Sequence, residues 1–251
     1  MVAAPAAADA VARARRLPGL GVGLHLVLVD GHSVLPRTEI PGLTRADGAF
    51  DRNMVRTSVR VFLLPHIRRQ LAAEIRAQFE AFRATGLHLD HVNAHKHMHL
   101  HPTVARLLVE IGHDYGLKAV RLPSEPVAVL RAAFPQQRYS TPLYQGWIER
   151  LRHRLHGAGF VVNDHVFGLA WSGAMSEDRL LRLVPHLPDG VSEIYLHPAT
   201  EVSPALLTAM PAYRHREEFA ALLSPALKNR LAELRIALVS YTDVVAAHPR
   251  Q

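Results

Sequence analysis

Histidines form the part of this sequence best suited to chemistry. The chain has 17 of them, and five lie at odd-numbered positions in one short segment before Pro102, namely His91, His95, His97, His99 and His101. In an extended segment these side chains share one face, with alternate Cα atoms roughly 6–7 Å apart. Imidazoles at that spacing can bind one divalent metal ion. A solvated surface loop that holds no metal is the competing interpretation.

Two other histidines interrupt or end hydrophobic runs. His25 lies inside the apolar segment 21–29, and His197 precedes Pro198 at the end of the segment 192–197. A buried polar side chain needs a partner, and α/β folds build their sites where parallel strands end. Three strands that each carry a histidine therefore predict a metal or acid–base site. For His25 the alternative is a neutral core histidine with one hydrogen bond.

Other catalytic patterns do not occur in the sequence. It has no cysteine, so thiol chemistry and disulfides are excluded. It also has no Gly-x-Ser-x-Gly elbow, no phosphate-binding Gly-x-x-x-x-Gly-Lys loop, and no Gly-x-Gly-x-x-Gly between a strand and a helix. Hydrolysis by a metal-bound water is the class of reaction that remains best supported.

Hydrophobic periodicity predicts alternating helices and strands around these residues. A long loop over 30–53 is expected to cover a site. The alternation indicates a parallel sheet or a (β/α) barrel in one domain of residues 1–251. The predicted helices are 5–16, 67–85, 102–115, 143–156, 177–186 and two that flank Ser224-Pro225; the predicted strands are 21–29, 87–94, 118–122, 160–167, 192–197 and 236–241.

Composition limits the partners and the location. The formal net charge is +7, and of 29 basic residues only Lys96, Lys118 and Lys228 are lysines. The arginines are mixed with acidic residues, so no nucleic-acid partner is expected; contact with an anionic membrane surface fits the charge better. No apolar run approaches the roughly 18–20 residues of a membrane span. With no signal-like start either, we expect a cytoplasmic protein.

Four segments resemble the YdjC-like family, the ChbG/HpnK group of carbohydrate deacetylases. They are Gly23–Leu28, Asn93–Pro102, Glu193–Pro198, and Arg216-Glu217 together with Leu223–Pro225. The resemblance extends over nearly the whole chain, and the ordered combination is specific. The segment His91–Pro102 is most similar to the hopanoid-associated HpnK branch.

This resemblance implies an irregular (β/α) barrel of the polysaccharide-deacetylase type and removal of an N-acetyl group from an amino sugar. It implies one divalent metal ion, Mg or Zn, held by an aspartate and two histidines. By position His25 and His95 match the histidine ligands, and His197, which lines the site, is expected to be the general acid. Residues expected to bind substrate or to orient ligands are Asn93, His97, His99, Arg121 and Asp164. The HpnK branch suggests an N-acetylglucosaminyl hopanoid, hence a lipid-linked substrate and peripheral contact with the inner membrane; a homodimer is also expected.

Two features depart from the family pattern. Asn93 stands where many relatives have aspartate. The family's opening Asp-Asp-Phe-Gly strand has no counterpart here, since Met1–Pro5 resembles the end of its second strand. We therefore expect the first strand and helix to be absent, Met1 to be an internal methionine of a truncated domain, and the chain to have little activity alone. The alternatives are an inactive remnant and a metal hydrolase that acts on another amide or on a phosphoester.

Overall fold

The computed structural model describes residues 1–140 and 145–248. Contacts within the chain divide it into two compact units. Unit 1 comprises Met1–Arg121, Glu149–Val162 and Ser240–Gln251, and unit 2 comprises Leu122–Ile148 and Asn163–Val239. The expectation of one family domain over residues 1–251 stays a prediction.

Unit 1 is built on a sheet of four parallel strands in the order β1-β2-β3-β4. The strands are β1 (Leu24–Leu26), β2 (Val92–Ala94), β3 (Ala119–Val120) and β4 (Val161–Val162). The prediction of an α/β fold with a parallel sheet is confirmed. Closure of the sheet into a barrel stays a prediction.

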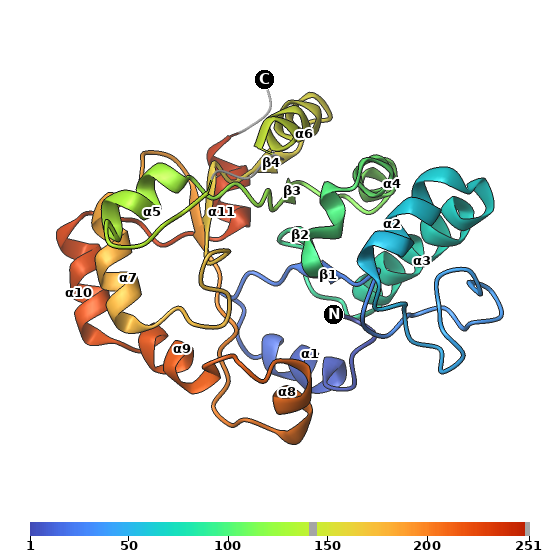
Figure 1. Cartoon of the computed structure of the whole chain (residues 1–251), viewed down its shortest axis with the longest axis horizontal. Coiled ribbons are helices and arrows are strands. Elements are labelled where there is room, and N and C mark those ends of the chain that lie inside the picture. Colours follow the sequence, from blue (N-terminus) through green and yellow to red (C-terminus); the bar gives the residue numbers. More distant parts are fainter. Residues whose placement is uncertain (141–144, 249–251) are drawn as a thin grey trace. The chain divides into compact units, whose positions relative to one another are not determined.

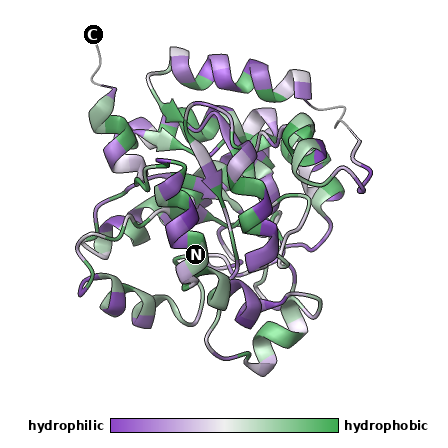
Figure 2. Cartoon of the chain, turned by 90° about the vertical axis from the view of Figure 1, so that its left-hand side faces the viewer, coloured by the Kyte–Doolittle hydropathy of each residue, from purple (hydrophilic) through white to green (hydrophobic). Residues whose placement is uncertain are grey.

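Amphipathic helices cover this sheet. The helix predicted over 67–85 is α3 (Pro65–Ala84), and its apolar residues at helical spacing, Ile67, Leu71, Ile75 and Phe79, are at most 1% exposed. Pro65 starts the helix at a position where its missing N–H costs nothing. Helix α3 packs against α2 (Met54–Leu63) and α4 (Pro102–Asp114), and Figure 1 shows these helices side by side. Figure 2 shows hydrophobic and hydrophilic residues alternating along the helices.

Unit 1 also contains α1 (Ala7–Ala14) and α11 (Tyr241–Ala247).

Two buried polar residues of α3 hold the chain that follows β1. Gln78 donates to the Val27 carbonyl (2.7 Å) and accepts from the Val27 N–H (3.0 Å). The Glu74 carboxylate accepts from the N–H groups of Val34 and Leu35, both at 2.9 Å. Burial raises the pKa of Glu74 against the lowering effect of those hydrogen bonds. This is why the loop after β1 has a fixed path although it forms no long strand.

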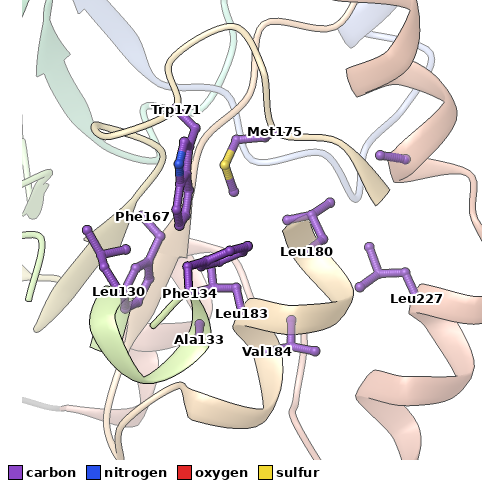
Figure 3. Close-up of a cluster of buried hydrophobic side chains, with 11 residues drawn as sticks. Leu130, Ala133, Phe134, Phe167, Trp171, Met175, Leu180, Leu183, Val184 and Leu227 are labelled. Atoms are coloured by element: carbon purple, nitrogen blue, oxygen red, sulfur yellow. The ribbon is translucent and has the colours of Figure 1, made fainter. Parts of the chain in front are cut away.

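Unit 2 has two parallel strands and its own core. Strands β5 (His165–Phe167) and β6 (Ser192–Ile194) pair in parallel. Figure 3 shows the core between helices, where Phe134, Phe167 and Trp171 meet Met175 and Leu183. The helices are α5 (Val127–Ala133), α7 (Glu177–Leu183), the 3-10 helix η2 (Val184–His186), α8 (Pro204–Ala209), α9 (His215–Leu222) and α10 (Pro225–Glu233), while α6 (Gln145–Gly157) has residues in both units.

Several predicted elements differ from the structure. The strand predicted over 236–241 is wrong, because Ser240 caps α11 with a reciprocal Ser240–Asp243 capping box. The strand predicted over 160–167 is two strands, β4 and β5, in separate sheets. The helix predicted from 143 is described from Gln145 on, since 143 and 144 lie outside the described residues. Helices α2, α5 and α8 were not predicted. No helix of the described residues is long and apolar enough to cross a membrane.

Candidate active site

Three neighbouring strands place His25, Asn93 and Arg121 in a row. His25 on β1 is the register partner of Asn93 on β2. Arg121 follows β3, and its N–H donates to the Val92 carbonyl on β2 (2.9 Å). Register partners on adjacent parallel strands point to the same face of the sheet. The structure therefore brings three of the sequence-predicted site residues together.

His25 and His95 form the imidazole pair expected for a metal site. Their ring centroids lie 5.8 Å apart at an interplanar angle of 70°. Burial is the main reason that the pKa of His25 falls to about 3, with the charges of His95 and Arg121 acting in the same direction. His25 is thus neutral at physiological pH, which is the form that binds a metal ion.

The histidines after β2 do not share a strand face, so that part of the prediction is wrong. His95–Leu100 forms the 3-10 helix η1, with Lys96 (φ 50°) and His97 (φ 53°) in the left-handed region. Non-glycine residues pay about 1–2 kcal/mol each for that conformation. An ion pair between Lys96 Nζ and Asp30 Oδ2 (2.6 Å) secures the turn. Because of this turn, His95 and the histidines that follow it are not on one extended segment.

His99 is buried at this turn, and His101 caps the helix that follows it. His99 is 1% exposed, and burial with the nearby charges of His97 and Arg121 lowers its pKa to about 3. The rings of His97 and His99 lie 6.1 Å apart. His101 is the N-cap of α4 and accepts a hydrogen bond from the Thr103 N–H (3.3 Å).

Asp90 and His91 lie next to this row. His91 belongs to the histidine segment noted in the sequence, but neither residue had an assigned role in the site. His91 Nδ1 donates to Asp90 Oδ2 (2.8 Å), and Asp90 Oδ1 accepts from the N–H (2.8 Å) and hydroxyl (2.7 Å) of Thr242. A Cβ at Gly23 would lie 2.5 Å from the His91 ring, and one at Gly21 would lie 2.9 Å from the Asp90 carboxylate. The Gly-Val-Gly run before β1 is therefore the sequence signal for this pair, since it leaves room for both side chains.

Asp90 makes the stability of unit 1 dependent on pH. Burial would raise its pKa, but the hydrogen bonds from His91 and Thr242 prevail and lower it from 3.8 to about 2. Because the folded-state pKa is depressed, this stabilisation of about 2 kcal/mol is present above pH ~3.8 and is lost as the pH falls towards 2. We expect Asp90→Asn to lower the free energy of unfolding by about that amount at pH 7, and the deficit to shrink below pH ~3.8. Urea titrations at several pH values measure it, with the exposed Asp47→Asn as control; an equal deficit at every pH would contradict this assignment.

His197 lies in unit 2, and two buried residues hold its backbone. Glu218, which is fully buried, accepts from the His197 N–H (2.5 Å) and from the Met175 N–H (2.9 Å). His215 Nδ1 donates to the His197 carbonyl (2.5 Å). The His197 ring lies 4.9 Å from that of Tyr213. Sequence reasoning missed Glu218 and His215, although both belong to the segment around the Arg216-Glu217 pair.

Asp164 has a structural contact in unit 2. Its carboxylate accepts from the Val191 N–H (2.8 Å) and lies beside Gly190, so it orders the turn before β6. Unit 2 also contains a cavity of about 540 Å³ lined by Trp171, Arg179 and Glu125 among others. None of the sequence-predicted site residues lines that cavity.

The donor set fits two of the positions around a divalent ion. His25 and His95 each offer an imidazole nitrogen, the kind of ligand that Zn and similar ions prefer. Among residues 1–140 and 145–248, no three histidine, aspartate or glutamate side chains are grouped closely enough to enclose an ion. These residues would therefore supply two of the ligands of a metal ion.

Comparison with known proteins relates this arrangement to a family. A carbohydrate deacetylase of Geobacillus stearothermophilus is 29% identical over 240 residues, covering 95% of this chain and 82% of that protein. One of Vibrio vulnificus is 30% identical (98% and 84%), and a chitooligosaccharide deacetylase of Yersinia pestis is 29% identical (90% and 79%). A crystal structure from Enterococcus faecalis, named for cellobiose-phosphate cleavage, superposes with a TM-score of 0.71 at 20% identity, covering 97% and 85%. The model of the YdjC-like protein family matches residues 1–233, and the chain therefore belongs to that family.

Proposed function

We propose that this protein is a metal-dependent hydrolase that removes the N-acetyl group from an amino sugar. The observation that carries the proposal is the pair of imidazoles, His25 on β1 and His95 directly after β2, of which His25 is partly buried and neutral. Relatives named carbohydrate or chitooligosaccharide deacetylases, similar over at least 90% of this chain, support the reaction and the substrate class. Family membership and the paired histidines point to the same kind of chemistry.

His25 and His95 would hold the ion in this account. A bound divalent ion would supply Lewis acidity and lower the pKa of a bound water. Strand register and the Lys96–Asp30 ion pair hold the backbone that carries the two imidazoles. Arg121, at the end of β3, is a donor positioned to bind sugar or acetamide oxygens.

His197 is the proposed proton donor to the departing sugar amine. An amine leaves an acetyl carbon only when it is protonated, and a histidine can donate that proton near neutral pH. Glu218 and His215 fix both backbone polar groups of His197. They are positioning residues for the proton donor.

A lipid-linked sugar is the form of substrate that we favour. The support is an exposed apolar face of α2, where Val55 (69% exposed), Val59 (50%) and Leu63 (62%) recur at helical spacing. Large exposed apolar patches mark contact sites, and an amphipathic helix with interspersed arginines suits an anionic membrane surface. A second copy of the chain is the other partner that this face could take.

Release of acetate tests the proposed function. We expect the purified chain to release acetate slowly from N-acetylated chitooligosaccharides, to stop when it is treated with a chelator, and to recover when Zn²⁺ or Mg²⁺ is added. An N-acetylglucosaminyl lipid in anionic vesicles should react faster than the soluble sugar. Phosphate release from a phosphoester without acetate release would favour the alternative hydrolase. No acetate from any substrate at saturating metal would contradict the proposal.

A further inference from the structure

The Asn93 side chain lies between groups whose hydrogen bonds require opposite orientations of its amide. One end of the amide is 2.5 Å from His25 Nδ1. The other end is 3.4 Å from His91 Nε2 and 3.1 and 3.2 Å from the two terminal nitrogens of Arg121. All four residues lie in unit 1, and Asn93 is 7% exposed. Each end must therefore be satisfied by these neighbours.

The two orientations satisfy different neighbours. With its oxygen towards His25, Asn93 accepts from His25 Nδ1–H and donates to His91 Nε2, but its NH₂ group also faces the Arg121 donors. With its nitrogen towards His25, Asn93 donates to His25 Nδ1 and accepts twice from Arg121. Arginine has donors only. Arg121 therefore favours the second orientation, and His91 favours the first.

The orientation decides which nitrogen of His25 is free. When Asn93 donates to Nδ1, the single proton of the neutral ring is on Nε2, and neither nitrogen has a lone pair for a metal ion. When Asn93 accepts from Nδ1–H, Nε2 has its lone pair exposed. A neutral imidazole binds a metal through the unprotonated nitrogen, and the hydrogen bond of the other nitrogen fixes the tautomer.

We propose that Asn93 is a two-position amide that controls metal binding at His25, with His91 selecting the binding orientation and Arg121 the excluding one. The inference rests on the proposed metal-dependent function. In the binding orientation, hydrogen bonds link the side chains of Asp90, His91 and Asn93, and Asn93 holds the proton on His25 Nδ1. A carboxylate at position 93 would hold that proton directly. Asp90 holds the proton on His91 Nδ1, so His91 Nε2 can accept from Asn93.

Single substitutions should move the metal affinity in opposite directions. Arg121→Met removes the competing donors, and we expect zinc to bind about tenfold more tightly. His91→Phe keeps a ring against Tyr241 but removes the acceptor. We expect binding about tenfold weaker, at the lower end of the loss found when partners of metal-binding histidines are removed. Asn93→Asp presents an acceptor in either orientation, so Arg121→Met added to it should give no further gain.

Histidine ring NMR provides the measurement. Zn²⁺ is titrated into protein labelled with ¹⁵N in histidine, and the His25 signals report both tautomer and site-specific Kd. We expect the Nε2–H tautomer in metal-free wild type and the Nδ1–H tautomer in Arg121→Met. An Nδ1–H tautomer in the wild type, or a Kd unchanged in Arg121→Met, would overturn the proposal. If no zinc binds, the proposed function fails, while the metal-free tautomers still decide the role of Asn93.

Discussion

Replacing His95 with alanine should abolish both tight metal binding and deacetylation. His95 is one of two imidazoles in the pair, and its ring lies 5.8 Å from that of His25. A metal ion supplies several kcal/mol of stabilisation in hydrolysis, and each 1.36 kcal/mol is a factor of ten in rate. We therefore expect acetate release to fall by about 10³-fold or more. Acetate assays and metal analysis of the dialysed protein measure the two effects.

An exposed histidine provides the matched control for that experiment. His88 lies on the surface before β2, so His88→Ala removes an imidazole from this histidine-rich chain without touching the pair. We expect its activity and bound metal to equal those of the wild type. A His95→Ala protein that keeps deacetylase activity would refute the site described for unit 1.

Glu218→Gln should destabilise the protein and impair His197. The carboxylate is fully buried and accepts two backbone hydrogen bonds, from Met175 and from His197. Glutamine has one oxygen, so its NH₂ group would face a buried N–H donor. Hydrogen bonds to buried charged groups contribute about 1.5–3 kcal/mol. We expect a loss of about 3 kcal/mol in the free energy of unfolding, measured by urea titration with tryptophan fluorescence.

The neighbouring Glu217→Gln is the control for this substitution. Glu217 is exposed and pairs with Arg214 at 3.4 Å, and exposed pairs of this kind contribute little. Its stability should match the wild type within about 0.5 kcal/mol. If Glu218→Gln is equally harmless, Glu218 does not support His197. If folded Glu218→Gln has a lower kcat and an unchanged KM, Glu218 positions His197 for proton transfer and does not contribute to sugar binding.

Local patterns were sufficient to predict the helices that pack on the sheet. The apolar stripe of α3 and the Pro102 start of α4 follow directly from spacing and from proline's preference for a first turn. Periodicity did not show that Glu74 and Gln78, on the buried face of α3, hold the chain after β1. Their partners are 39 to 51 residues away, beyond the reach of a local pattern.

The histidine turn and the last helix show two other limits. Lys96 and His97 adopt a left-handed conformation that neither residue type favours, so the extended segment that would place alternate histidines on one face does not form. Segment 236–241 contains apolar residues, yet Leu238 and Val239 are 80% and 58% exposed, and the capping box at Ser240 prevails. Hydrophobic content alone could not separate a strand from exposed chain before a helix.

The site residues that strand order brings together could be predicted from the sequence. Those that depend on contacts between residues far apart in the chain could not. His25 and Asn93 come together because adjacent parallel strands bring them into register. Asp90 depends on Thr242, 152 residues later, and the contacts that orient Asn93 involve His91 and Arg121 together. Such contacts depend on side-chain geometry that a single sequence does not encode in any short pattern.

An anomalous diffraction map of crystals soaked with Zn²⁺ tests the central claim most directly. The claim is that His25 and His95 bind one divalent ion in this chain. We expect a peak between the two rings, about 2.0–2.1 Å from a nitrogen of each, and for His25 that nitrogen is Nε2. Zinc bound only at surface histidines such as His88, with no peak between His25 and His95, would contradict it.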